Sequence, residues 1–154
     1  MTATVGVAIR VARPADHEAI VELWDRCGLT RPWIDAASEL ELKVATDPDG
    51  LLVAEADHGA LAGTVMAGFE GHRGWVNYLA VDESRRGEGI GATIMAEAER
   101  LLVERGCPKL NLQVRSTNQG VIDWYRSLGY EPDHAVGLGK RLIPDVPEAG
   151  APAQ

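Results

Sequence analysis

The alternation of apolar and polar residues predicts a series of strands and helices along the chain. Strand patterns occupy residues 7–12, 51–56, 60–69, 75–81 and 109–114, and a last strand is predicted within Tyr130–Leu142. Helical spacing of apolar residues predicts helices over residues 16–27, 36–45, 89–105 and about 116–128. The order β-α-α-β-β-β-α-β-α-β indicates one α/β or α+β domain built around a single mixed sheet.

Residues with strong capping and turn preferences mark the ends of these elements. Pro14 stands at the entry to the first helix, and Asp35 is placed to cap the second. Gly106 is placed to end the third helix. Residues 144–154 contain three prolines and are predicted to form a disordered tail, so the folded domain is predicted over residues 1–143.

The stretch RRGEGIGA, Arg85 to Ala92, joins a predicted strand to a predicted helix. The first N–H groups of a helix have no partner inside the helix, and the helix dipole is positive at that end. Glycines allow an anion to approach such a backbone closely and permit positive φ angles. The loop therefore predicts a site for a di- or triphosphate group. Taken alone, a plain turn with solvated arginines is the alternative.

The same loop also matches the dinucleotide pattern G-x-G-x-x-G/A at Gly87, Gly89 and Ala92. That pattern requires an acidic residue at the end of the next strand, where this chain has Gln113-Val114-Arg115. The loop also lies past the middle of the chain, which leaves no room for further strand–helix–strand units. A Rossmann domain is therefore disfavoured.

Composition argues against several other classes of protein. The chain has 154 residues, with 15 Lys and Arg against 23 Asp and Glu, and a net charge of −8 disfavours general nucleic-acid binding. Cys27 and Cys107 have neither metal-ligand spacing nor a disulfide framework, so no metal and a cytoplasmic location are expected. The first ten residues do not resemble a signal peptide, and the run GALAGTVMAGF is too short to cross a membrane.

Two motifs, in order and separated by one strand, resemble those of the GNAT acetyltransferases. Arg86 to Gly91 fits R/Q-x-x-G-x-G/A, the family's loop for the pyrophosphate of acetyl-CoA. Asn118 through Tyr125 to Gly129-Tyr130 resembles the family segment N-x-x-(small or apolar)-x-x-x-Y-x-x-x-G-F/Y. The resemblance covers about residues 7–142. The segments RPW, GHRG, RGCPK and LGKRL are similar to the small bacterial YpeA-type branch.

The resemblance implies a GNAT fold, with a mostly antiparallel sheet flanked by about four helices. It also implies transfer of an acetyl group from acetyl-CoA to a primary amine, by direct attack in a ternary complex. Backbone groups of Leu79, Ala80 and Val81 would pair with the pantetheine arm, and the Leu79 N–H would stabilise the oxyanion. Asn118 would touch the pantetheine side of the cofactor, and Tyr125 would stand near the sulfur. The residues expected around the pyrophosphate are Arg86, Gly87, Glu88, Gly89, Ile90, Gly91 and Ala92.

Two of these residues have structural alternatives. A phenol with a pKa near ~10 suits proton return to a thiolate whose thiol pKa is near ~8.5, which favours a catalytic Tyr125. Tyr125 also lies on the apolar stripe of its helix, so core packing is its alternative role. Asn118 is placed to cap the same helix, and this role is compatible with a cofactor contact.

The sequence departs from the family pattern where a base is expected. A lysine-like ammonium, with a pKa near ~10.4, must lose a proton before it attacks. Trp75 and Gln113 occupy positions where relatives carry a glutamate, and Glu88 replaces a basic residue, which should weaken phosphate attraction. Three alternatives stay open: a water chain, an acyl-CoA-binding sensor without turnover, or a base elsewhere. The candidates for such a base are Asp25, Asp35, Glu70 and His72.

The expected partners are acetyl-CoA and an amine acceptor, either a small molecule or a peptide. Arg31-Pro32-Trp33 lies where the family's acceptor mouth is expected, with packing of Trp33 as the alternative. Alternation places Trp75 and Asn77 on one face, where they could line the acceptor side, although core packing is the default for Trp75. The acidic composition favours cationic acceptors. Neither nucleic acid nor a membrane is an expected partner, and a homodimer is left open.

Overall fold

The computed structural model describes residues 6–145 and is organised around a five-stranded sheet in the order β1-β2-β3-β4-β5. Adjacent strands are antiparallel from β1 to β4, and only β5 runs parallel to its neighbour β4. This confirms the predicted single, mixed and mostly antiparallel sheet. The strands are β1 (Val7–Val11), β2 (Leu51–Ala56), β3 (Leu61–Phe69), β4 (Gly74–Val81) and β5 (Leu110–Asn111).

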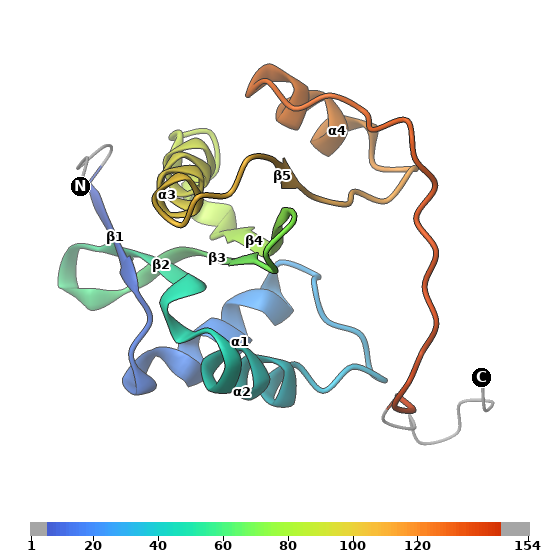
Figure 1. Ribbon diagram of the computed structural model, residues 1–154. Coiled ribbons are helices and arrows are strands. Elements are labelled where there is room, and N and C mark those ends of the chain that lie inside the picture. The colour runs from blue at the N-terminus through green and yellow to red at the C-terminus, as the bar shows by residue number, and fades with distance from the viewer. Residues whose placement is uncertain (1–5, 146–154) are drawn as a thin grey trace.

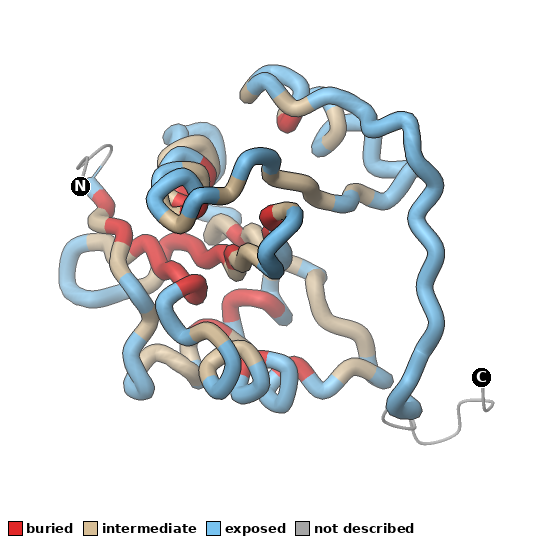
Figure 2. The backbone as a smooth tube through the Cα atoms, viewed as in Figure 1, coloured by how far each residue is buried: buried red, intermediate tan, exposed pale blue. Residues whose placement is uncertain are grey.

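Helices cover both faces of this sheet (Figure 1). On one face lie α1 (His17–Arg26) and α2 (Ala36–Thr46), and on the other lies α3 (Ile90–Glu104). The fourth helix, α4 (Gln119–Ser127), lies on the α3 side, beyond β5. The two layers bury separate apolar clusters, as expected when successive strand residues point to opposite faces. Figure 2 shows the buried residues concentrated along the sheet and the inner sides of these helices.

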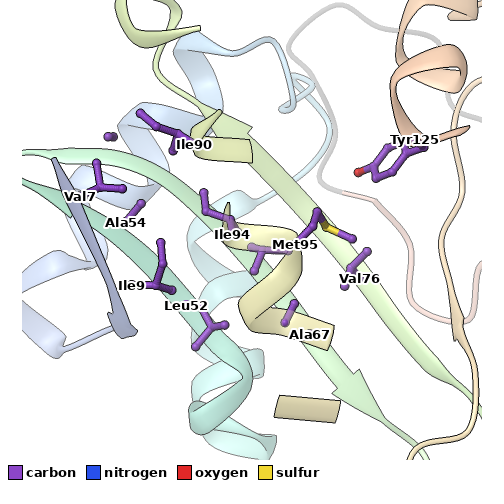
Figure 3. Packing of buried hydrophobic residues seen from close by; sticks show 13 residues of the cluster. Val7, Ile9, Leu52, Ala54, Ala67, Val76, Ile90, Ile94, Met95 and Tyr125 are labelled. Carbon is purple, nitrogen blue, oxygen red and sulfur yellow. The ribbon is translucent and has the colours of Figure 1, made fainter. Parts of the chain in front are cut away.

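The cluster under α3 forms the larger part of the core (Figure 3). Ile90, Ile94 and Ala98 recur at helical spacing and face the sheet, as the sequence predicts. The opposite cluster centres on Trp24 of α1, which is fully buried. Full burial of each large apolar side chain contributes roughly 1.5–3 kcal/mol relative to exposure. Both faces of the sheet are therefore held by helix packing.

The predicted helix caps on α2 and α4 are confirmed. Asp35 accepts a hydrogen bond from the Ser38 N–H at 3.0 Å, and Asn118 accepts one from the Val121 N–H at 3.3 Å. Each bond satisfies one of the N–H groups that a helix start leaves without a partner. Local sequence therefore determined where these two helices begin.

The predictions for the C-terminal strands are wrong. The strand expected over residues 109–114 shrinks to Leu110–Asn111, because β4 and β5 pair only at their starts. The last strand, expected within residues 130–142, is absent from the described chain, where residues 130–145 contain neither helix nor strand. The predicted tail, residues 144–154, lies outside the described residues from 146 onward.

A β-bulge interrupts the pairing of β3 with β4. Thr64 lies opposite Ala80 and Met66 lies opposite Asn77, so one residue of β3 faces two of β4. One of these two, Tyr78, has a φ of 52°. This left-handed conformation is uncommon for a residue with a side chain, and it re-aims the backbone that follows.

Three buried contacts hold the bulge in place. The Thr64 hydroxyl donates a hydrogen bond to the Tyr78 carbonyl at 3.0 Å and accepts one from the Trp24 indole N–H at 2.9 Å. The Tyr78 ring stacks on Trp24, with ring centroids 4.0 Å apart. Thr64 is fully buried, and it is the one buried polar side chain within residues 6–145. Helix α1, β3 and β4 are thus locked together at the bulge.

Asp47 links the C-terminal ends of two helices on opposite faces of the sheet. Its carboxylate accepts hydrogen bonds from Lys43 in the last turn of α2, at 2.8 Å, and from Arg105 at the end of α3, at 3.0 Å. Lys43 also donates to the Ala67 carbonyl of β3 at 2.6 Å. These bonds fasten α2 and α3 to each other around the end of the sheet.

We expect Thr64→Val to destabilise the fold, because it keeps the side-chain volume but leaves the Trp24 N–H and the Tyr78 carbonyl without this buried partner. The free energy of unfolding should fall by about 1–3 kcal/mol, measured by urea denaturation followed through tryptophan fluorescence. Thr46→Val is the control, because the exposed Thr46 hydroxyl bonds only within its own helix, and its effect should stay below about 0.5 kcal/mol. Equal effects would contradict the assigned role of Thr64.

Candidate functional site

β4 has partners on both edges only at its start. β5 pairs with it at Gly74–Leu110 and Trp75–Asn111, and no further pair joins these two strands within residues 6–145. From residue 76 to residue 81, the edge of β4 that faces β5 therefore has no strand partner in the described chain. Backbone N–H and C=O groups on such an edge can pair with an extended ligand.

The predicted residues Leu79, Ala80 and Val81 lie on this stretch, where Leu79 is the second residue of the bulge and the other two follow it. Leu79 is half-buried against the α3 cluster and Ala80 is buried. The Val81 carbonyl accepts a hydrogen bond from Arg86 Nε at 3.4 Å. The unpaired edge and the glycine loop are therefore adjacent.

The glycine loop places helix N–H groups in front of open space. Gly87 and Gly89 both have φ = 83°, and a Cβ atom at either would meet nothing within 4 Å. Gly89 precedes α3, and the first helical bond runs from the Thr93 N–H to the Gly89 carbonyl at 3.1 Å. The N–H groups of residues 90–92 precede that bond. In contrast to α2 and α4, α3 receives no side-chain cap from the described residues.

Gly91 has a different role from the two loop glycines. A Cβ atom at Gly91 would lie 3.1 Å from the ring of Trp124 on α4, which is closer than almost all real Cβ contacts. The absence of a side chain thus allows α3 and α4 to approach each other. Ile90 is buried beneath the loop, and Ala92 is partly buried. The predicted loop therefore has two parts: residues 87–89 are exposed, whereas Ile90 and Gly91 pack against the rest of the protein.

The charge of Glu88 is partly offset inside the loop. Arg85 forms an ion pair with Glu88 at 3.0 Å, and this hydrogen bond lowers the pKa of the Glu88 carboxyl below its usual range. Arg86 is exposed beside the loop. The Glu88 carboxylate, which we expect to weaken phosphate attraction, is thus already paired with Arg85. A surface ion pair of this kind contributes little energy, so Arg85 offsets the charge of Glu88 only in part.

Tyr125 packs in the core cluster beneath α3 and also lines a groove along residues 109–114. It is 8% exposed and makes edge-to-face contacts with Trp124 and Tyr130, at centroid distances of 4.8 and 5.7 Å. Figure 3 shows its hydroxyl directed from α4 toward the side of Met95 and Val76. Burial raises the pKa of Tyr125 to about 12. The phenol therefore stays protonated at neutral pH and has a proton to donate to a ligand.

Three of the four predicted candidates for a base have structural partners. Asp35 caps α2, and Asp25 accepts a hydrogen bond from the Thr30 hydroxyl at 2.9 Å. Glu70 accepts hydrogen bonds from the backbone N–H groups of Arg73 and His72, which lower the pKa of its carboxyl. His72 lies exposed in the same turn.

The default expectation that Trp75 packs in the core is wrong, because Trp75 is 39% exposed. Alternation directs its neighbour Val76 into the α3 cluster and therefore turns Trp75 to the other face. Asn77 is also exposed. Both side chains are exposed, and their expected place along the acceptor side stays a prediction.

Sequence reasoning missed Glu39. The Tyr78 hydroxyl donates a hydrogen bond to the Glu39 carboxylate, which joins the bulge of β4 to α2. Burial, together with this bond, raises the pKa of Tyr78. The two residues are 39 positions apart, and the only local signal was the position of Glu39 on the exposed side of a predicted helix. The Glu39 carboxylate therefore lies beside the hydroxyl of Tyr78, the residue that precedes Leu79.

A hollow of about 390 Å³ lies between α1, the loop after it and the start of α2. Arg31 lines this hollow and donates a hydrogen bond to the Gly28 carbonyl at 2.9 Å. Trp33 of the same loop is 36% exposed and belongs to neither core cluster. The hollow carries more acidic than basic groups; its charged residues are Glu22, Asp25, Arg31 and Asp35.

Residues 6–145 contain no group of three or more His, Cys, Asp or Glu side chains arranged to hold a metal ion. None of the helices described is long and apolar enough to cross a membrane.

A mixed sheet with an unpaired central edge, beside an uncapped helix that starts in a glycine loop, defines an acyltransferase of the GNAT type. The model of the acetyltransferase (GNAT) family matches residues 17–130, and the chain belongs to this family. It is an acyl-CoA-dependent N-acetyltransferase.

Relatives and solved structures agree with this family assignment. An acetyltransferase of Pectobacterium atrosepticum is 47% identical over 89% of this chain and 96% of its own length. One of Yersinia enterocolitica is 45% identical over the same shares. Among solved structures, Ard1 of Thermoplasma volcanium has a TM-score of 0.72 at 23% identity, over 81% of this chain and 82% of its own. The YpeA-type branch stays a prediction.

Proposed function

We propose that the protein transfers an acetyl group from acetyl-CoA to a primary amine of a small molecule or peptide, by direct attack in a ternary complex. One juxtaposition carries this proposal: the edge of β4 that has no strand partner within residues 6–145 lies next to the start of α3, which has no side-chain cap from these residues, and Arg86 donates a hydrogen bond to the Val81 carbonyl between them. An aminoglycoside acetyltransferase of similar fold, with a TM-score of 0.70 at 20% identity over 88% of this chain and 98% of its own, was solved with a CoA-containing bisubstrate analogue.

The cofactor would lie along two adjoining surfaces. The backbone of Leu79, Ala80 and Val81 would pair with the pantetheine arm, in place of the strand that β4 lacks there. The N–H groups of residues 90–92, the loop backbone from Gly87 to Gly89 and the Arg86 guanidinium would hold the pyrophosphate. The left-handed φ angles of both glycines favour this role, because the space above them is open.

The chemistry at the thioester would rest on two donors. The Leu79 N–H would stabilise the oxyanion when the amine nitrogen attacks the carbonyl carbon. As the C–S bond breaks, the Tyr125 hydroxyl would donate a hydrogen bond to the departing thiolate. With a pKa of about 12, against ~8.5 for a thiol, Tyr125 would stabilise the thiolate rather than give up its proton completely. Asn118, whose side chain caps α4, would contact the pantetheine through its exposed remaining groups.

The acceptor would enter through the hollow between α1 and α2. Glu22, Asp25 and Asp35 outnumber Arg31 on its wall, which favours a positively charged amine over an anionic acceptor. A cytoplasmic location belongs to the same proposal and is supported by the two cysteines, Cys27 and Cys107, which are both free thiols.

The proton of the acceptor ammonium would leave through Tyr78 and Glu39. The Tyr78 oxygen would accept the amine proton while the Tyr78 hydroxyl proton passes to the Glu39 carboxylate, which already accepts a hydrogen bond from it. Tyr78 would end neutral, and exposed Glu39 would release the proton to solvent. Glu39 would then be the base, a role that neither Trp75 nor Gln113 can fill at the positions where relatives carry a glutamate.

We expect Gly89→Val to abolish most acetyl-CoA binding, with at least about 100-fold weaker affinity by calorimetry, because a β-branched residue cannot keep φ near 83° and the cradle distorts. Gly106→Val is the matched control. Gly106 has φ = 84° at the other end of α3, again with open space around a Cβ. Both variants should lose about 1–2 kcal/mol of stability, but only Gly89→Val should lose binding. Normal binding by Gly89→Val would remove the loop from the site.

With acetyl-CoA and a panel of amines, the wild-type protein should release free thiol, and Tyr125→Phe should release it about 10- to 1000-fold more slowly with little change in affinity for acetyl-CoA. Because a pKa of about 12 keeps the hydroxyl protonated, the ratio of the two rates should stay constant between about pH 6 and 10. Tight binding without thiol release on any amine would instead indicate an acyl-CoA-binding sensor or regulatory module.

We expect Glu39→Gln and Tyr78→Phe to lower kcat by about 10- to 100-fold each, without weakening acetyl-CoA binding. The double variant should be no slower than the single ones, because the two groups act as one relay. The deficit should shrink as the pH approaches ~10.4, where the free amine forms without help. Glu41→Gln is the control, since it removes the same charge from the exposed side of α2. A deficit independent of pH would mean that Glu39 only supports the fold.

A further inference from the structure

Trp124 of α4 is in contact with the first turn of α3. A Cβ atom at Gly91 would lie 3.1 and 3.3 Å from the Cζ2 and Cη2 atoms of the Trp124 ring, and 3.5 Å from Cγ2 of Val81. Gly91 is therefore the point at which α3, α4 and the end of β4 meet. Trp124 is half-buried and packs against the cluster under α3. Its ring thus lies beside residues 90–92, whose N–H groups precede the first helical bond of α3.

The same ring contacts Tyr125. The ring centroids of Trp124 and Tyr125 are 4.8 Å apart, in an edge-to-face arrangement with 69° between the planes. Tyr130 makes a second edge-to-face contact with Tyr125 at 5.7 Å, and its backbone N–H donates a hydrogen bond to the Tyr125 carbonyl at 3.1 Å. Two aromatic rings therefore hold Tyr125, whose hydroxyl is directed toward the side of Met95 and Val76 (Figure 3).

The contact between Trp124 and Tyr125 does not follow from their being neighbours in sequence. Successive residues of a helix point about 100° apart, so side chains at i and i+1 do not face each other. The Trp124 ring is held beside Tyr125 by packing from outside its own helix. α3 provides this packing at Gly91, where the missing side chain lets the ring lie against the backbone. One ring thus connects the position of Tyr125 to that of the first turn of α3.

We propose that Trp124 is a positioning residue that links the pyrophosphate site, the backbone of residues 87–92, to the orientation of Tyr125. This inference rests on the proposed function, in which acyl-CoA occupies that site and Tyr125 donates a hydrogen bond to the leaving thiolate. Trp124 would act only through Tyr125. Contiguous packed side chains can carry a small shift from one site to another.

The link would give the nucleotide end of acyl-CoA a role in the reaction at its other end. Interactions with a remote, non-reacting part of a substrate can serve to orient the groups at the reacting centre. Here, a pyrophosphate held by the N–H groups of residues 90–92 would fix the first turn of α3, and Gly91 and Trp124 would pass this constraint to Tyr125. The donor for the sulfur would therefore be aligned when the nucleotide is in place.

Gly91→Ala tests the contact without removing a ring. The added methyl group must displace the Trp124 ring by a few tenths of an ångström, which should lower kcat at saturating acetyl-CoA by about 3- to 10-fold. In a Trp124→Phe background the same substitution should change kcat by less than about 2-fold, because phenylalanine lacks the two ring atoms that meet the methyl group. Gly120→Ala is the matched control, since it adds the same methyl group to α4 in open space and should leave kcat unchanged.

The loss of rate should also depend on the Tyr125 hydroxyl. In a Tyr125→Phe background, Gly91→Ala should change kcat by less than about 2-fold, because the donor that Trp124 positions is already absent. An equal loss with and without this hydroxyl would mean that Gly91→Ala acts on the cofactor directly, and it would overturn the inference while the proposed function holds. A wild type that releases no thiol with any amine would contradict the proposed function and, with it, a role of Trp124 in turnover.

A second experiment needs no turnover. The chain has three tyrosines, so labelling with 3-fluorotyrosine should give three ¹⁹F resonances, and Tyr125→Phe identifies that of Tyr125. ADP carries a pyrophosphate but lacks the pantetheine that would lie beside Tyr125. At saturating ADP, with binding confirmed by calorimetry, the Tyr125 resonance should shift in the wild type and stay in place in Trp124→Phe. Circular dichroism should confirm that each variant is folded.

The outcomes of this experiment separate the link from the pyrophosphate site. A Tyr125 resonance that does not move in the wild type, or that moves equally in Trp124→Phe, would overturn the link through Trp124 and leave the proposed function intact. If ADP does not bind, the loop is not a pyrophosphate site, and the inference fails together with the proposed function.

Discussion

A strand inside a sheet normally has a strand partner on each edge, but within residues 6–145 β4 has partners on both edges only at Gly74 and Trp75. This early end of pairing is the constraint on which the candidate site depends. The stretch without a second strand partner, residues 76–81, contains the bulge and ends just before the glycine loop, so its edge leads toward the N–H groups at the start of α3. An elongated ligand with an anionic end fits this order of donors without help from many side chains.

The bulge fixes where that unpaired edge points. A left-handed Tyr78 costs conformational energy, and the buried bonds of Thr64 with Trp24 and with the Tyr78 carbonyl over-determine it. The same tyrosine donates a hydrogen bond to Glu39, so one residue links the core to the exposed side of α2. Rigid support of this kind is what precise placement of a backbone donor requires.

Local signals predicted most of the fold, and non-local pairing explains what they missed. β2 matches its predicted range, 51–56, because alternation and flanking turns define it without reference to other segments. The strand near residue 110 was predicted too long, since its length depends on how far β4 stays beside it. The loop glycines could be found from spacing, but the packing role of Gly91 against α4 could not. The contact of Glu39 with Tyr78 likewise could not be found from local signals, because 39 positions separate the two residues.

Contacts near both ends of α2 fix its position. Near its C-terminal end, Lys43 and Arg105 hold the helix through Asp47 around the end of the sheet. Nearer its start, Glu39 accepts a hydrogen bond from Tyr78 of β4, and Ala36 is buried. Because both halves of this 11-residue helix are held, the wall that α2 gives to the hollow has little freedom to tilt, and we expect it to keep its shape when a ligand enters.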